Sequence, residues 1–116
     1  MLASSYKLKS EADFSKVYKF GRRQSYPLFT VRYFYDPKVT TKIAVVASIK
    51  VVGKANERNR ARRRIWSALS KVVENIPKKG ILLIFTAQKS VNKAEWANLS
   101  GLVESVISNF ANIRHK

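Results

Sequence analysis

The chain has 116 residues, no cysteine, and 23 lysines and arginines against seven aspartates and glutamates, a formal net charge of +16 at pH 7. This length and the 46% share of hydrophobic residues predict one folded domain over residues 1–116 and exclude an extended disordered chain. The lack of cysteine excludes disulfides and cysteine–histidine zinc sites, and the charge favours a polyanionic partner, with nucleic acid ahead of an anionic membrane surface.

No apolar run approaches the roughly 18–20 residues that a membrane-spanning helix needs. The first 14 residues, MLASSYKLKSEADF, lack the apolar stretch of a signal peptide. We therefore expect a cytoplasmic protein without a membrane partner.

Residues 10–20 are predicted to form the first helix. Ser10 can cap its start, and Gly21 offers a stop. Three apolar side chains fall at positions i, i+3 and i+4 of one face: Phe14, Val17 and Tyr18. These side chains are either core residues or part of a binding surface on which an unpaired base stacks.

Three segments have the composition of strands. Residues 27–35 (PLFTVRYFY) are rich in aromatic and β-branched residues and precede a turn signal at Asp36-Pro37. Residues 42–50 (KIAVVASIK) are more completely apolar, which predicts a central strand, and residues 81–87 (ILLIFTA) form a third buried strand. Because a helix joins the last two, they are predicted to be parallel neighbours.

The segment from Gly53 to about Asn75 is predicted to be a helix with two parts. From Ile65 onward, an apolar stripe faces the sheet. Residues 54–64 hold one acid, Glu57, and six bases, so intrahelical ion pairs cannot explain the run, and the arginine fork suits phosphate oxygens. Asn56 and Asn59 can cap the helix start, although an exposed Asn59 could equally contact a ribose or phosphate. The predicted outward side chains are Asn56, Asn59, Arg60, Arg63 and Arg64, with Arg62 near the edge and Arg58 on the apolar side, one turn before the stripe.

A last helix is predicted from Asn92, with Glu95 at its third position. The elements then run α-β-β-(β)-α-β-α, an α+β two-layer sandwich with a mixed sheet of about four strands.

These segments resemble the protein subunit of bacterial ribonuclease P. The resemblance rests on two blocks: Gly53-Lys54-Ala55 with Glu57-Arg58-Asn59-Arg60 and Arg62-Arg63-Arg64-Ile65, and the earlier Asp13-Phe14, Val17-Tyr18 and Gly21-Arg22. It implies a left-handed crossover between the parallel strands. It also implies a catalytic RNA subunit that holds most of the Mg²⁺ and removes the 5′ leader of precursor tRNA, with no other protein partner required.

Carried over to this chain, the resemblance implies two sets of contacts. The RNA subunit would be bound by Lys54, Arg58, Asn59, Arg60, Arg62, Arg63 and Arg64. The leader would be bound by Phe14, Val17, Tyr18, Tyr33, Lys50 and Lys89, with Tyr33 equally able to be a core residue. The chain departs from the family pattern over residues 48–52, at Gln88, and at Trp66-Ser67.

The acidic residues offer no sign of a protein active site. A metal-dependent nuclease needs clustered carboxylates, and the seven here are scattered singly. The chain is therefore expected to assist an RNA enzyme, and a basic ribosomal or general RNA-binding protein is the alternative.

Overall fold

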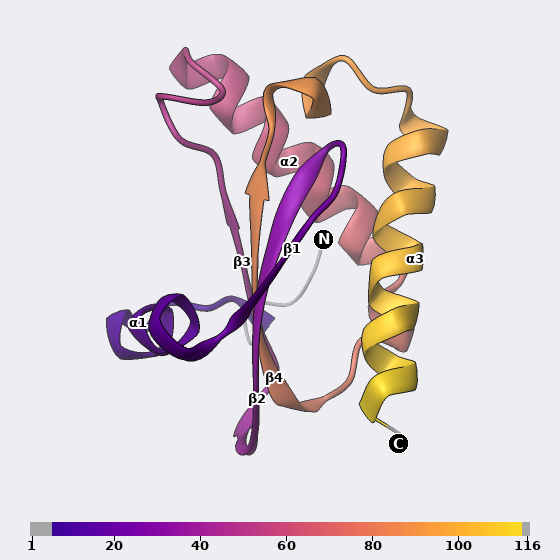
Figure 1. The fold of residues 1–116 in the computed structure, drawn as a ribbon. Coiled ribbons are helices and arrows are strands. Elements are labelled where there is room, and N and C mark those ends of the chain that lie inside the picture. Colours follow the sequence, from indigo (N-terminus) through magenta and orange to yellow (C-terminus); the bar gives the residue numbers. More distant parts are fainter. Residues whose placement is uncertain (1–5, 115–116) are drawn as a thin grey trace.

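A computed structural model describes residues 6–114 and contains one mixed sheet (Figure 1). Its strands are β1 (Arg22–Ser25), β2 (Phe29–Thr40), β3 (Lys42–Val46) and β4 (Lys79–Ala87), in the order β1-β2-β4-β3. β1 and β4 are antiparallel to β2, whereas β3 is parallel to β4, as predicted for that pair. The α+β class and the mixed four-stranded sheet are confirmed, and the left-handed sense of the β3–β4 crossover stays a prediction.

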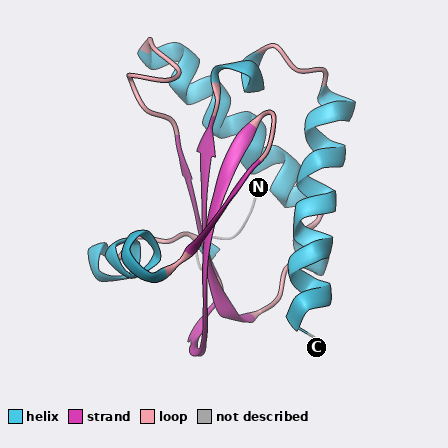
Figure 2. Ribbon diagram, in the orientation of Figure 1, coloured by secondary structure: helices cyan, strands magenta, loops and turns pink. Residues whose placement is uncertain are grey.

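The helices lie on both faces of the sheet (Figures 1 and 2). α2 (Ala55–Lys71) and α3 (Trp96–Arg114) cover one face, and α1 (Glu11–Phe20) lies against the other. Short 3₁₀ helices, η2 (Val73–Asn75) and η3 (Lys89–Asn92), follow α2 and β4. No helix within residues 6–114 is both long and apolar enough to span a bilayer.

Two apolar clusters stabilise this arrangement. The larger one joins the sheet to α2 and α3, and a smaller one under α1 contains Leu8, Val17, Ala44, Leu82 and Ile84. β4 contributes to both clusters because its alternate side chains point to opposite faces. Its continuous apolar run, ILLIF, is the pattern of a strand that is covered on both sides.

The prediction that residues 42–50 form a central strand is wrong in place and length. β3 ends at Val46 and lies at the edge of the sheet. Its apolar character has another cause: the N-terminal segment covers this edge, where the Leu8 amide donates to the Ile43 carbonyl (2.9 Å). A strand with both faces covered and a shielded edge has the composition of a central one.

The predicted turn at Asp36-Pro37 does not end β2. The strand continues to Thr40 through an irregularity between Tyr35 and Thr40, where its register with β4 shifts. Asp36 still makes the hydrogen bond that is typical of a turn, because its carboxylate accepts from the Lys38 amide (3.0 Å).

Gly21 ends α1 for a steric reason. Ser10 caps the helix start as predicted, its hydroxyl accepting from the Asp13 amide at 3.4 Å. Gly21 has a φ of −76°, which any residue can adopt. A Cβ at this position, however, would lie 2.4 Å from the Val17 carbonyl oxygen and 2.7 Å from that of Tyr33. Glycine therefore permits close approach of α1 to β2.

Two helix starts differ from the predictions. α3 begins at Trp96 rather than Asn92, whose side-chain amide donates to the Glu57 carbonyl (2.9 Å) and ties η3 to the first turn of α2. The N-cap residue of α2 is Lys54, which makes no side-chain capping hydrogen bond, so the predicted capping by Asn56 or Asn59 is wrong.

Candidate nucleic-acid interface

The rotation of α2 is set by four small or apolar side chains packed on the sheet. Their spacing follows the helical repeat, which leaves the opposite side of the helix to solvent. These residues are Ala61, Ile65, Ala68 and Leu69, none more than 1% exposed.

The exposed side of α2 carries most of the predicted RNA-binding residues. Lys54, Asn59, Arg60 and Arg63 are exposed as expected. Arg62 is half-buried and donates to the Asn59 side-chain carbonyl, so these two residues form one hydrogen-bonded unit. We call residues 54–63, the N-cap and first turns of α2, the α2 surface. It offers guanidinium and amide groups, and Glu57 is its single acid.

Arg64 is a correction to the predicted outward set. Its guanidinium donates to the carbonyls of Val91 and Ala94, the second at 2.7 Å, and the side chain is half-buried. Both acceptors lie in the connection between β4 and α3. Arg64 therefore holds that connection against α2, with two of its five N–H donors used within the fold.

Arg58 is also drawn partly inward. It is half-buried, and its Nε is shielded from solvent with no hydrogen-bond partner among the described residues. Because residue 58 lies on the apolar side of the helix wheel, burial of its stem is expected. Only the end of this side chain remains for a contact with RNA.

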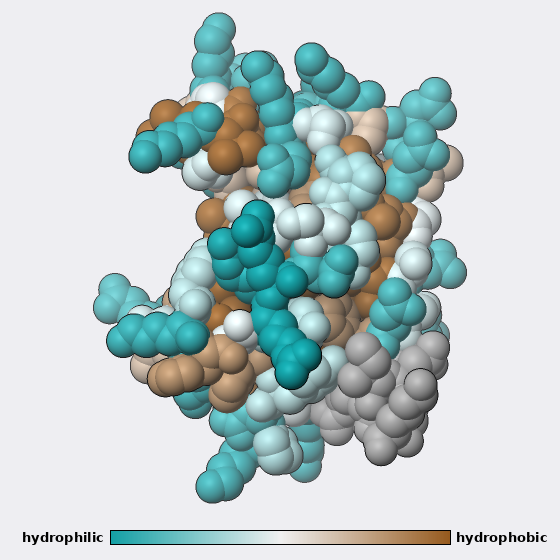
Figure 3. Space-filling model, viewed as in Figure 1, coloured by the Kyte–Doolittle hydropathy of each residue, from teal (hydrophilic) through white to brown (hydrophobic). Residues whose placement is uncertain are grey.

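A second basic surface lies on the face of the sheet that α1 only partly covers. Figure 3 shows the molecule hollowed between α1 and the β3–α2 loop (residues 47–54). Tyr18 of α1 borders this side with 49% of its surface exposed, and the Arg32 guanidinium lies 5.0 Å from its ring centroid. Phe14 is half-buried against the small cluster. Val17 is 1% exposed and is a core residue, so it cannot contact a leader directly.

Side chains from alternate strand positions form the floor of this surface, and the sequence predictions missed them. Thr30 and Arg32 of β2 share the α1 face, and Arg23 of β1 pairs with Arg32. Thr86, opposite Thr30 on β4, has a buried hydroxyl oxygen without a partner among the described residues. The signal was present, because Thr30 and Arg32 alternate with apolar residues in β2.

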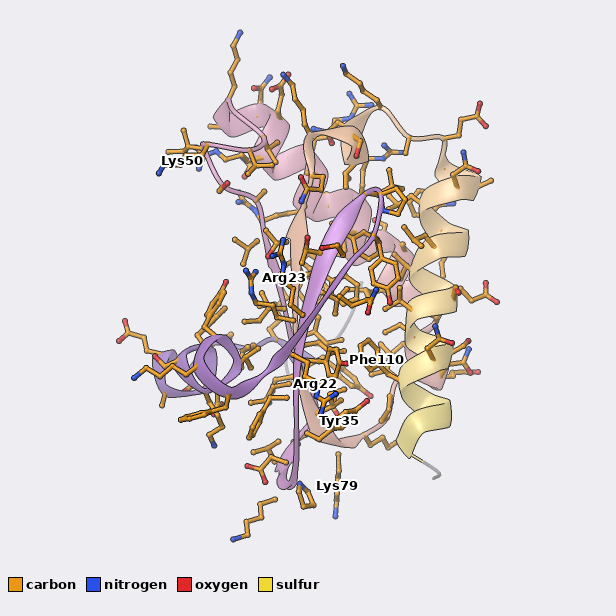
Figure 4. The ribbon with its side chains drawn as sticks, viewed as in Figure 1. Arg22, Arg23, Tyr35, Lys50, Lys79 and Phe110 are labelled. Carbon is orange, nitrogen blue, oxygen red and sulfur yellow. The ribbon has the colours of Figure 1, made fainter. Side chains whose placement is uncertain are left out.

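Two lysines of the predicted leader set are exposed, and one of them lies on the loop that borders the hollow. Lys50 is exposed on the β3–α2 loop, and Figure 4 shows it and Arg23 on the same side of the sheet as α1. Lys89 is exposed at the start of η3, next to Gln88, whose side chain reaches the Thr30 hydroxyl at 3.5 Å. Both lysines are open to solvent, and their contact with a leader stays a prediction.

Tyr33 is a correction to the predicted leader contacts. Its ring packs edge-on against Phe110 of α3 (centroids 4.9 Å apart) and Tyr35 (5.7 Å). It therefore lies on the opposite face of the sheet from Tyr18, with the side chains that pack on α2 and α3. Figure 4 shows Phe110 and Arg22, the β1 partner of Tyr33, on that side.

The acidic residues form no metal site within the described chain. No group of three or more His, Cys, Asp or Glu side chains there is placed to hold an ion. One acid, Asp36, forms an ion pair with Lys16 (3.6 Å) that connects the irregular part of β2 to α1.

Comparison with known proteins gives a consistent result. The family model described as Ribonuclease P matches residues 2–111. A Clostridium kluyveri protein named ribonuclease P protein component is 31% identical over 107 residues, covering 88% of this chain and 91% of that protein. A Pseudanabaena protein of the same name is 26% identical over 109 residues, or 93% of each chain.

Solved structures share the fold. The Staphylococcus aureus RNase P protein superposes with a TM-score of 0.73 at 22% identity, covering 88% of this chain and 92% of that one. The Thermotoga maritima RNase P protein gives a TM-score of 0.75 at 19% identity, covering 89% and 96%.

Proposed function

Because this chain belongs to the bacterial ribonuclease P protein family, we propose that it binds two RNAs at once, on opposite sides of its sheet. α2 would bind the catalytic RNA subunit, and the hollow beside α1 would bind the 5′ leader of precursor tRNA. The chain would act in the cytoplasm, where precursor tRNA is made, and would assist endonucleolytic removal of the leader. The observation that carries this proposal is the pair of basic surfaces, one on α2, which packs on one face of the sheet, and one beside α1 on the other face.

The α2 surface suits the backbone of a folded RNA. Each arginine or lysine that neutralises a phosphate releases condensed counterions, which gives affinity without base specificity. Anchoring by Ile65 and Leu69 holds these cations on a rigid helix. Such a surface would recognise the shape and charge of the RNA subunit rather than a sequence.

The hollow beside α1 suits a single strand. Tyr18 offers an exposed ring for stacking, and Arg23, Arg32 and Lys50 offer charge for the backbone. Aromatic rings with nearby cations are the common means of binding unpaired nucleotides with little sequence preference. Tolerance of sequence is what binding of different leaders requires.

We place catalysis on the RNA subunit, together with the Mg²⁺ that the reaction needs. The described protein residues offer no cluster of carboxylates for this ion, so the protein would contribute through its charge. Lysine and arginine between two polyanions reduce their repulsion and would allow the complex to form at lower Mg²⁺ concentration.

Reconstitution with the cognate RNA tests the proposal. Cleavage of precursor tRNA would be followed at low Mg²⁺ with and without the protein, using one substrate with a long leader and one with a single leader nucleotide. We expect the protein to accelerate cleavage and to favour the long leader. Equal rates with and without protein would refute the proposed function, and this result would instead favour a general RNA-binding protein.

A further inference from the structure

The outer face of α2 carries a further candidate binding surface beyond its run of arginines. A hollow of about 440 Å³ lies over the second half of the helix. The residues lining it follow the helical repeat i, i+3, i+4, i+7 and i+8, so they share one face. They are Arg63, Trp66, Ser67, Ser70 and Lys71.

Trp66 gives this hollow an aromatic wall. Its side chain is half-buried and packs against the edge of the main core, which holds the ring in place. The Lys7 ammonium lies 5.7 Å from the ring centroid. A fixed indole ring with a neighbouring cation is a favourable surface for a nucleobase beside its phosphate.

The other lining groups suit an anion that carries hydrogen-bonding hydroxyls. Arg63 and Lys71 supply positive charge, and none of the lining residues is acidic. The Ser70 hydroxyl donates to the Trp66 carbonyl (2.9 Å), which leaves its oxygen free to accept. Ser67 is exposed and can donate or accept. The volume lies in the range of about 300–1,000 Å³ that is typical of small-ligand sites.

We propose that this hollow binds an unpaired nucleotide of the RNA subunit, with the base on Trp66 and the phosphate between Arg63 and Lys71. The inference rests on the proposed function and extends it. The hollow shares Arg63 with the α2 surface, and Arg60 to Lys71 spans about 17 Å of helix, so one RNA can contact both. The sheet separates the hollow from the surface beside α1, which argues for the RNA subunit over the leader.

Tryptophan fluorescence provides a direct test, because the chain has two tryptophans, Trp66 and Trp96. In Trp96→Phe, Trp66 is the single reporter, and we expect saturable quenching on titration with the RNA subunit. In Trp66→Phe, Trp96 is the single reporter, and its emission should stay nearly constant. A leader oligonucleotide alone should not quench Trp66 emission, even at high concentration.

Affinity measurements separate stacking from packing. Trp66→Leu keeps an apolar side chain at the core edge but removes the ring, and it should weaken binding to the RNA subunit about tenfold. Trp66→Tyr should restore most of the affinity. Thermal unfolding of each variant would show that the comparison is made on folded protein.

Three results would overturn the inference. They are unchanged Trp66 emission at saturating RNA subunit, equal affinities of Trp66→Leu and the parent chain, or quenching by the leader alone. If any occurs while the protein still accelerates precursor tRNA cleavage, the nucleotide site is refuted and the proposed function stands. If the protein fails to accelerate cleavage, the proposed function itself is refuted.

Discussion

Replacing Arg64 with alanine should destabilise the fold, although this residue belongs to a run of arginines. The substitution removes the two hydrogen bonds to the carbonyls of Val91 and Ala94. Donors that carry charge contribute roughly 1.5–3 kcal/mol each, but Arg64 itself is only half-buried, so its truncation admits water to these carbonyls and we expect a total loss of about 2 kcal/mol. With an unfolding entropy of roughly 2.1 cal/mol/K per residue, this loss lowers Tm by about 8 °C.

Arg63→Ala is the matched control, because it removes the same charge from the neighbouring, exposed position. Its Tm should stay within about 2 °C of the parent, since exposed substitutions change stability by roughly 0.5 kcal/mol or less. Arg64→Lys should recover part of the loss, because an ammonium can reach one carbonyl but lacks the fork. Melting curves followed by circular dichroism provide the measurement, and equal Tm values for Arg64→Ala and Arg63→Ala would refute the structural role of Arg64.

Three further substitutions test the remaining parts of the account. Gly21→Ala should lower the free energy of unfolding by about 2 kcal/mol or more in urea titrations, because its Cβ would clash with two backbone carbonyls, whereas Gly101→Ala, whose Cβ meets nothing within 4 Å, should not destabilise the chain. Arg60→Ala with Arg63→Ala should reduce the slope of log affinity for the RNA subunit against log salt by about 1.5–2, and an unchanged slope would show that neither contacts phosphate. Tyr18→Ala should weaken binding of a long-leader substrate about tenfold and leave a substrate with almost no leader unaffected, and equal losses on both would indicate packing instead.

The sequence was sufficient for elements whose pattern has a single physical cause. The apolar repeat of α2 and the continuous apolar run of β4 each reflect burial, so both elements were predicted, although α2 ends at Lys71 rather than near Asn75. β1 was not predicted, because its four residues, RRQS, are polar and exposed and lack the apolar or β-branched composition of a strand. Its pairing with β2 decides its conformation, and that information lies in the partner strand.

In the candidate site, too, the sequence predicted what depends on local periodicity and missed what depends on how the elements pack. Periodicity predicted which side of α2 is exposed, but it could not show that the β4–α3 connection packs beside Arg64. Alternation along β2 puts Tyr33 and Val31 on one face, yet the two faces of a sheet are equivalent until the helices are assigned to them. Once α1 lies against one face and α3 against the other, Tyr33 belongs to the core side and Arg32 to the hollow.

The most direct test of the two-sided account is cleavage of RNA by an iron chelate attached to a single cysteine. The chain has no native cysteine, so Arg60→Cys labels the α2 surface and Ser25→Cys labels the α1 side of β1, opposite Thr30. In the complex with the RNA subunit and precursor tRNA, we expect the probe at residue 60 to cut the RNA subunit and the probe at residue 25 to cut the leader. Cleavage of the same RNA by both probes, or of the leader from residue 60, would contradict the account.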